Sequence, residues 1–139
     1  MKTVSKPMGY RLVGLGFLLA LALALPQTAL AHAKLTRSSP ADKASLTNAP
    51  QQIELWFSEL LDDKFNSIEV VASKDVNAKP RVNLAQGEPK VDPKDRTHLT
   101  IELKALEPGE YTVDWRVLSR DGHSAPGRFT FRVLAPVKK

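Results

Sequence analysis

Two of the three histidines in the sequence lie where they could share a metal ion. His32 directly follows Ala29-Leu30-Ala31, a small-residue pattern typical of signal-peptidase cleavage sites. Cleavage after Ala31 would free the α-amine of His32, and that amine and the imidazole Nδ1 could then chelate one ion together. An α-amine has an ordinary pKa of ~7.7–8.0, below the ~10.4 of lysine, so a metal can displace its proton near neutral pH.

The second candidate group is the loop at residues 119–123, in which Asp121 and His123 flank Gly122. Glycine lets the backbone turn sharply, so the carboxylate and the imidazole can project from one loop toward one point. Together with His32, the donors are one amine, two imidazoles and one carboxylate. This set of nitrogen and oxygen ligands suits a tetragonal Cu(II) ion, and copper stands at the top of the divalent affinity series.

A metal-free explanation of the same residues stays open. Asp-Gly is a common hairpin sequence that needs no metal, and any residue type can follow a cleavage site. The sequence alone does not bring residue 32 and the loop together, although a β-sandwich gathers its loops at its two ends. Sulfur ligands, which Cu(I) prefers, are missing from the mature chain: there is no cysteine, and both methionines, Met1 and Met8, precede Ala31.

The start of the chain predicts a cleaved signal peptide. Basic residues precede an apolar run at residues 12–25, and Pro26 ends this run before the cleavage pattern. As a helix the run would span about 21 Å, which is less than the ~30 Å of a bilayer core. We therefore predict a signal peptide over residues 1–31, one domain over residues 32–139, export to the periplasm, and no membrane span in the mature form.

The composition argues against a nucleic-acid partner. The formal net charge is +5, but three of the basic residues, Lys2, Lys6 and Arg11, belong to the leader, so the mature charge falls to about +2. The other basic residues are scattered along the chain and form no stripe. Without cysteine no disulfide can form, so apolar packing must hold the domain together.

Alternation of apolar and polar residues dominates the mature chain and predicts β-strands. The predicted strands are residues 33–39, 53–58, 67–73, 98–103, 111–119 and 128–134, with a shorter one at 81–84. Pro40, Pro50 and the Pro108-Gly109 pair mark turns between them, and residues 75–97 form a long polar connection. These features predict an all-β fold, an immunoglobulin-like antiparallel β-sandwich or Greek-key barrel.

The mature chain resembles the CopC-type periplasmic copper-binding proteins of bacteria. The resemblance rests on four segments taken jointly: HAKLTRSSPAD at 32–42, P-x-x-IELWFSE at 50–59, LEPGEYTVDWRVLSRDGH at 106–123, and G-x-F-x-F-x-V at 127–133. It implies an immunoglobulin-like β-barrel that binds one Cu(II) ion through the N-terminal histidine and the Asp-x-His of the late loop. In this sequence the implied metal ligands are His32, Asp121 and His123.

The resemblance also implies a function, that of a monomeric, non-enzymatic carrier or buffer of copper in copper resistance or homeostasis. Its partners besides the ion would be an inner-membrane copper importer or another periplasmic copper protein. Two features depart from the family pattern. No methionine follows residue 31, so the methionine-rich Cu(I) site of some members should be absent, and Lys43 stands where many members have glycine.

Two other functions stay open. Copper polysaccharide oxygenases also begin at a processed histidine and carry a second histidine on a β-sandwich. They need a broad aromatic surface for the sugar chain, however, and only 6% of this chain is aromatic. The other alternative is an envelope adhesion or scaffold domain that binds no metal.

Several residues near these motifs are expected to have other roles. His98 is expected at the solvent-facing start of a strand, and Trp56 could be exposed and contact a partner, because it alternates with core residues. Arg120 and Ser124 are candidates for orienting the metal ligands. Three acidic residues in a predicted solvated loop could attract a cation toward the site. They are Glu59, Asp62 and Asp63.

Overall fold

The structure is a computed structural model that describes Lys2 and residues 33–136. The chain divides into two compact units, Met1–Leu30 and Ala31–Lys139, and the strands belong to the second. Apart from Lys2, the predicted signal peptide and its cleavage site lie outside the described residues. Within the described part of the chain, no helix is long and apolar enough to cross a bilayer.

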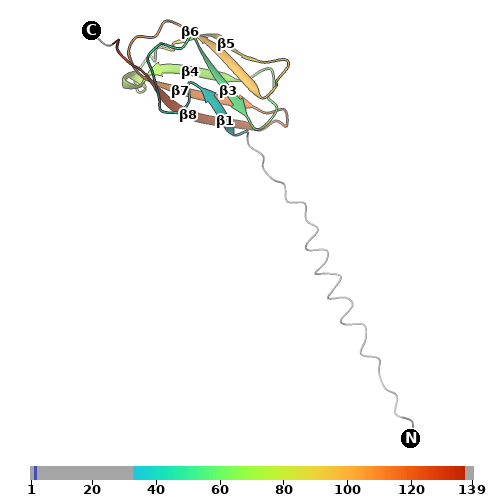
Figure 1. The fold of residues 1–139 in the computed structure, drawn as a ribbon. Coiled ribbons are helices and arrows are strands. Elements are labelled where there is room, and N and C mark those ends of the chain that lie inside the picture. Colours follow the sequence, from blue (N-terminus) through green and yellow to red (C-terminus); the bar gives the residue numbers. More distant parts are fainter. Residues whose placement is uncertain (1, 3–32, 137–139) are drawn as a thin grey trace. The chain divides into compact units, whose positions relative to one another are not determined.

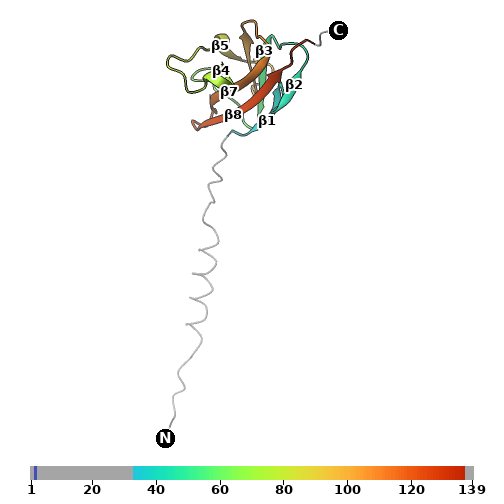
Figure 2. The ribbon, with the colours of Figure 1, turned by 90° about the vertical axis from the view of Figure 1, so that its left-hand side faces the viewer.

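Among the described residues, eight strands and one short 3-10 helix follow each other along the chain. They are β1 (Leu35–Ser39), β2 (Ala44–Leu46), β3 (Gln52–Phe57), β4 (Ser67–Ala72), η1 (Ser73–Asp75), β5 (Ala85–Val91), β6 (His98–Leu103), β7 (Gly109–Leu118) and β8 (Ser124–Val133). The strands form two four-stranded sheets, with the orders β1-β3-β6-β5 and β2-β8-β7-β4, which pack face to face (Figures 1 and 2). The predicted all-β sandwich is confirmed.

The core consists of the inward-facing residues of both sheets. Alternation places Ile53, Leu55 and Phe57 of β3 on the buried face, as predicted from the sequence. Val113 and Val117 of β7 face them from the other sheet and are fully buried. Each such side chain gains about 1.5–3 kcal/mol from burial, so the shared apolar face is what holds the two sheets together.

A buried tyrosine supports the immunoglobulin-like character of the sandwich. Tyr111, close to the start of β7, donates from its hydroxyl to the carbonyl of Glu107 at 2.6 Å. Burial raises the pKa of Tyr111 above its ordinary value. A tyrosine that reaches back to the backbone a few residues upstream is the tyrosine corner found in immunoglobulin-like sandwiches.

The strand pairs are antiparallel, as predicted, except for one parallel pair. β2 has no counterpart among the predicted strands, and it pairs in parallel with β8. β1 is an edge strand of one sheet, and the chain crosses from it to the other sheet, where β2 lies beside β8. β1 and β2 therefore form no hairpin. Lys43 lies in this crossover with φ 62°, a left-handed conformation that glycine adopts more easily. A strand of three residues is also too short to show alternation.

The predicted strand at residues 81–84 is wrong, because the strand in this region is β5, Ala85–Val91. Asn83 explains the difference. Its side-chain oxygen accepts hydrogen bonds from the amides of Val70, at 3.0 Å, and Ala85, at 2.9 Å. The side chain of Asn83 therefore replaces a backbone carbonyl as the acceptor for the Val70 amide, and the backbone supplies one bond to β4 here, from the amide of Leu84 to the Val70 carbonyl at 2.7 Å.

β5 itself lies within the stretch predicted as a polar connection. It is an edge strand of its sheet, and its register with β6 shifts between Gln86 and Lys90. Gly87 and Pro89 fall inside it. Edge strands tolerate both residue types and need little apolar alternation, so the sequence pattern of β5 resembles that of a loop.

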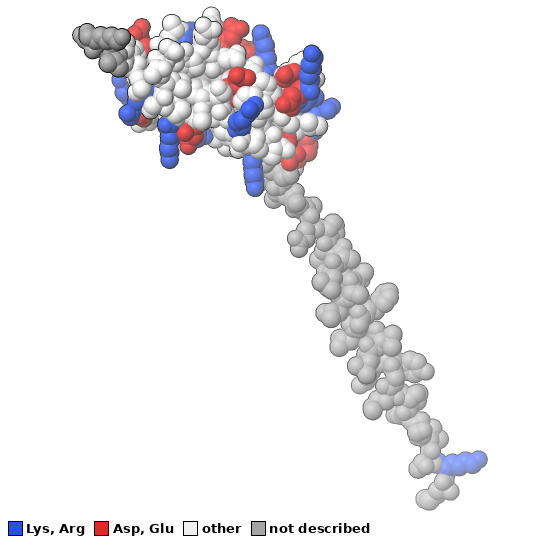
Figure 3. Space-filling model, in the orientation of Figure 1, with Lys and Arg blue, Asp and Glu red and all other residues white. Residues whose placement is uncertain are grey.

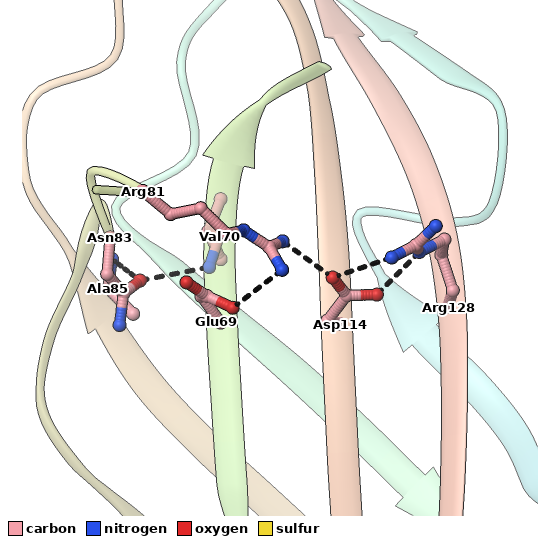
Figure 4. Close-up of polar contacts among 7 residues, drawn as sticks. All are labelled: Glu69, Val70, Arg81, Asn83, Ala85, Asp114 and Arg128. Carbon is pink, nitrogen blue, oxygen red and sulfur yellow. Dashed lines mark hydrogen bonds and ion pairs between the residues drawn. The ribbon is translucent and has the colours of Figure 1, made fainter. Parts of the chain in front are cut away.

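An ion-pair network ties the connection before β5 to the outer face of the second sheet (Figure 4). Arg81 donates to Asp114 of β7 at 2.8 Å and lies 3.4 Å from Glu69 of β4. Arg128 of β8 donates to both carboxylate oxygens of Asp114. These two guanidinium groups, Arg128 first, hold the pKa of Asp114 below its ordinary value.

Asp114→Asn should lower the free energy of unfolding by about 1–3 kcal/mol near neutral pH, because hydrogen bonds to charged groups are worth about that much. Since the folded-state pKa of Asp114 is lowered, its contribution is fully present above the ordinary pKa of ~3.9. It is lost as the pH falls through the lower folded-state value. Urea unfolding over this pH range measures the effect, and the difference from wild type should vanish in acid. Glu110→Gln, which breaks a more exposed pair with Arg132, is the control and should cost much less.

The β7–β8 hairpin is the longest pairing of the fold and runs from Gly109–Val133 to Leu118–Ser124. Within it, the ring of Trp115 lies over Gly127, its partner across the ladder. A Cβ atom at position 127 would stand 2.0 Å from this ring. Trp115 also packs edge-on against Phe57 of the other sheet, with the ring centroids 5.0 Å apart. Gly127 therefore provides the space that lets this tryptophan join the two sheets.

Gly127→Ala should destabilise the domain by about 1–3 kcal/mol, because the added methyl group must displace a packed indole ring. Chemical denaturation monitored by tryptophan fluorescence measures the change. In a Trp115→Leu background the same substitution should cost clearly less, since the two residues interact directly. An equal cost in both backgrounds would contradict the packing explanation.

Candidate metal site

The loop that carries Asp121 and His123 is a tight turn between β7 and β8. The amide of Ser119 donates to the carbonyl of His123 at 2.9 Å, and the hydroxyl of Ser119 donates to the same carbonyl at 3.0 Å. The amide of Gly122 donates to the carbonyl of Ser119, and Gly122 adopts φ 88°, a left-handed conformation in which it avoids strain. Both ends of the turn are thus tied to one buried serine, which is 2% exposed.

Asp121 and His123 lie side by side on this turn, as the sequence predicts. One carboxylate oxygen of Asp121 accepts a hydrogen bond from the amide of His123 at 3.0 Å, and the other lies 3.1 Å from its Nδ1. The amide of His123, followed by the side chains of Ser119 and His123, lowers the pKa of Asp121. Both side chains are about half exposed, at 47% and 49%. The pair therefore offers solvent an ionised carboxylate and an imidazole.

The base of this turn is anchored by the segment that follows β3. Leu61 forms a β-bridge with Ser119, the amide of Arg120 donates to Leu60 at 2.9 Å, and the amide of Asp62 donates to Leu118 at 2.8 Å. The side chain of Leu61 is fully buried. The turn cannot shift without breaking these backbone bonds or moving Leu61 out of the core.

The same segment holds the start of the described domain. His32 lies outside the described residues, but its neighbour Ala33 is only 3% exposed. The amide of Lys34 donates to the Ser58 hydroxyl at 3.0 Å, and the amide of Ser58 donates to the Lys34 carbonyl at 2.9 Å. Lys34, two residues after His32, and the residues on either side of Ser119, Leu118 and Arg120, are therefore all hydrogen-bonded to the segment 58–62.

Comparison with known proteins identifies the family. The family model of the CopC domain matches residues 35–134. The chain belongs to the CopC family.

Curated relatives agree with this assignment. Protein YobA of Escherichia coli K12 is 40% identical over 104 residues, which cover 74% of this chain and 79% of that protein. Copper resistance protein C of Pseudomonas syringae pv. tomato is 36% identical over 118 residues, 84% and 91% of the two chains. Copper transport protein CutJ of Bacillus subtilis is 35% identical over 111 residues, which cover 78% of this chain but only 19% of CutJ.

Solved structures show that the fold is also shared. CopC from Methylosinus trichosporium OB3b superposes with a TM-score of 0.62 at 29% identity, over 74% of this chain and 94% of that one. PcoC, a methionine-rich copper resistance protein from Escherichia coli, gives a TM-score of 0.60 at 32% identity, over 74% and 99%. The β-sandwich is therefore that of the CopC family.

His98 of this CopC chain is not the solvent-facing residue that its position suggests. Its side chain is 15% exposed and lies 3.0 Å from Glu54 through Nε2 and 3.7 Å from Asp92 through Nδ1. Its ring stacks on Trp56 with centroids 4.2 Å apart and planes 3° from parallel. The guanidinium of Arg37, on the other neighbouring strand, lies 3.5 Å from the centre of the Trp56 ring. Both faces of Trp56 are therefore covered, so neither is available to a partner.

The acidic residues near the site have local roles as well as charge. Asp62 accepts a hydrogen bond from the amide of Lys64 and so holds a turn. Asp63 pairs with Arg96 at 2.9 Å, and Arg96 also donates to the Leu61 carbonyl at 2.9 Å. Within the described residues, no group of three or more His, Cys, Asp or Glu side chains is placed to hold a metal ion.

The sequence does not point directly to Ser119 or to the segment 58–62 as the residues that position the turn, and Arg120 contributes through its backbone amide, which donates to Leu60. Asn66 was not evident either: its side chain accepts from the amide of Leu118 at 3.0 Å and donates to the carbonyl of Asp62 at 2.7 Å. One signal was present in the sequence. Ser119 continues the inward-facing series of β7, and a serine at a core position usually needs a hydrogen-bond partner.

Proposed function

We propose that the processed chain is a periplasmic Cu(II)-binding protein that carries or buffers one copper ion in copper resistance or homeostasis. The observation that carries the proposal is that residues 58–62 bind both Lys34, next to the predicted new N-terminus, and the turn with Asp121 and His123. Relatives named as copper resistance and copper transport proteins support copper as the ion.

The donors fit copper in its oxidised state. His32 would supply its amine and Nδ1, and His123 would supply a third nitrogen. Nδ1 of His123 lies 3.1 Å from the carboxylate of Asp121, so we assign Nε2 as the ligand atom and give the carboxylate the role of orienting the ring. Asp121 would then act mainly by orienting His123, and any bond of its own to the ion would be weak. A tetragonal set of nitrogen and oxygen favours Cu(II) over Cu(I).

A Cu(I) site built on methionine has no residues to form it in the mature chain. Both methionines, Met1 and Met8, belong to the predicted leader. We therefore propose a single Cu(II) site, in contrast to relatives described as methionine-rich. Delivery would go to a copper importer of the inner membrane or to another periplasmic copper protein.

A binding protein is favoured over a polysaccharide oxygenase by the positions of the aromatic residues. Phe57, Trp115 and Phe129 are buried in the core, and Trp56 has both ring faces covered. Phe65 is a large exposed aromatic residue, at 79%, but one ring does not make a sugar-binding surface. Relatives with copper in their names are named as resistance and transport proteins, which also supports a binding role.

A variant with one extra alanine ahead of His32 should bind Cu(II) at least about 100-fold more weakly, because it loses the chelating amine. Even residues that only orient metal ligands are worth about 10–100-fold in affinity. Competition with a chromophoric chelator measures the affinity. Thermal unfolding should show an unchanged fold, and electron paramagnetic resonance should show fewer nitrogen ligands. Unchanged affinity would mean that the amine is not a ligand.

Asp121→Ala should weaken Cu(II) binding by about 10–100-fold, and His123→Ala should weaken it more, because the histidine is a ligand and the carboxylate mainly orients it. The same chelator competition ranks the two variants. Asp63→Ala, which removes a nearby carboxylate paired with Arg96, is the matched control and should leave affinity almost unchanged. A larger loss for Asp121→Ala than for His123→Ala would reverse the roles assigned to the two residues.

A further inference from the structure

We propose that Ser58 is a positioning residue of the proposed metal site: its hydroxyl clamps Lys34, two residues after His32 in the sequence, to the segment that also anchors the Asp121–His123 turn. This inference rests on the proposed function, because it concerns the same copper site. From the sequence, Ser58 is only the last residue of a predicted strand.

The clamp consists of two hydrogen bonds between Ser58 and a single residue. The amide of Lys34 donates to the Ser58 hydroxyl at 3.0 Å, and the amide of Ser58 donates to the Lys34 carbonyl at 2.9 Å. Lys34 precedes β1, so these bonds extend the pairing of β1 with β3 by one residue toward the terminus. Lys34 is the second residue after His32 in the sequence, so the clamp acts on the chain close to the predicted new terminus.

Ser58 can act as a fixed point because its neighbours are anchored. Phe57, immediately before it, is 3% exposed in the core, and Leu61, three residues later, is fully buried. Between them, Leu60 accepts a hydrogen bond from Arg120 at the base of the turn. The path from Lys34 to the turn therefore runs through one short segment that is held at both ends.

The hydroxyl matters because it is the part of the clamp that depends on the side chain. Any residue at position 58 would keep the amide bond to Lys34, but without the hydroxyl the Lys34 amide would lose its acceptor. A chain terminus that is not tied down loses order readily. Ordering it again when the ion binds costs conformational entropy, and this cost lowers the affinity without changing the ligands.

The test compares processed proteins that begin at His32. Ser58→Ala should weaken Cu(II) binding by about five- to tenfold, the effect of one ordinary hydrogen bond, as measured by chelator competition. Its electron paramagnetic resonance spectrum should report the same number of nitrogen ligands as wild type. Ser58→Thr keeps a hydroxyl and should restore the affinity.

Thr36→Val is the matched control. Thr36 donates from its hydroxyl to the carbonyl of Trp56 at 2.9 Å, so it joins the same two strands two residues farther from the terminus. Its loss should leave Cu(II) affinity unchanged. An equal loss of affinity in Thr36→Val and Ser58→Ala would show only a general loosening of β1 and would overturn the positioning role.

A measurement on the metal-free protein tests the clamp independently of copper binding. In the metal-free protein, hydrogen exchange at the Lys34 amide should be faster in Ser58→Ala than in wild type and unchanged in Thr36→Val. Wild-type protein that failed to bind Cu(II) would overturn the proposed function. Wild-type protein that bound it with the same affinity as Ser58→Ala would overturn the clamp alone.

Discussion

The burial of Leu61 is the constraint on which the candidate site depends. Its side chain is fully buried, and its backbone pairs with Ser119 and accepts a hydrogen bond from Arg96. Burial of a leucine is worth about 1.5–3 kcal/mol, so the exposed residues around Leu61 cannot move far. The burial of Leu61 therefore fixes the positions of nearby surface contacts, such as that between Ser58 and Lys34, even though each of these contacts is weak.

The strands that bury one complete face could be predicted from the sequence. The strands without such a face could not be predicted. β3 and β7 alternate clearly because Ile53 and Val113 and their neighbours on the same face all enter the core. β2 has three residues, and β5 is a polar edge strand, so neither has a face that must be apolar. Val71 is an exception of the opposite kind, because alternation predicts that it is exposed and the structure buries it. It lies on the outer face of β4 but is 1% exposed, in a sheet whose outer face is tied by Arg81 to the connection that follows.

For the candidate site, the residue types that carry chemistry could be predicted, but not what positions them. Asp121 and His123 were recognisable because a carboxylate and an imidazole flank a glycine in a loop. The bonds at Leu60 and Asp62 are made by the backbone, which any residue type supplies, so the sequence carries no mark of them. His98 was misplaced because its stacking on Trp56 depends on the register of β3 and β6, which sequence alternation does not specify.

The division of the site into two halves has a consequence for when copper can bind, given the proposed function. The turn half, with Asp121 and His123, is complete as soon as the domain folds. The terminal half needs the free amine of His32, and no such amine exists while the leader is attached. A half-site with one imidazole and one carboxylate is a weak ligand set. The α-amine and Nδ1 of His32 would add two nitrogen ligands from one residue. Signal-peptide cleavage would thus switch on tight binding only after export, and the chain would not capture copper in the compartment where it is made.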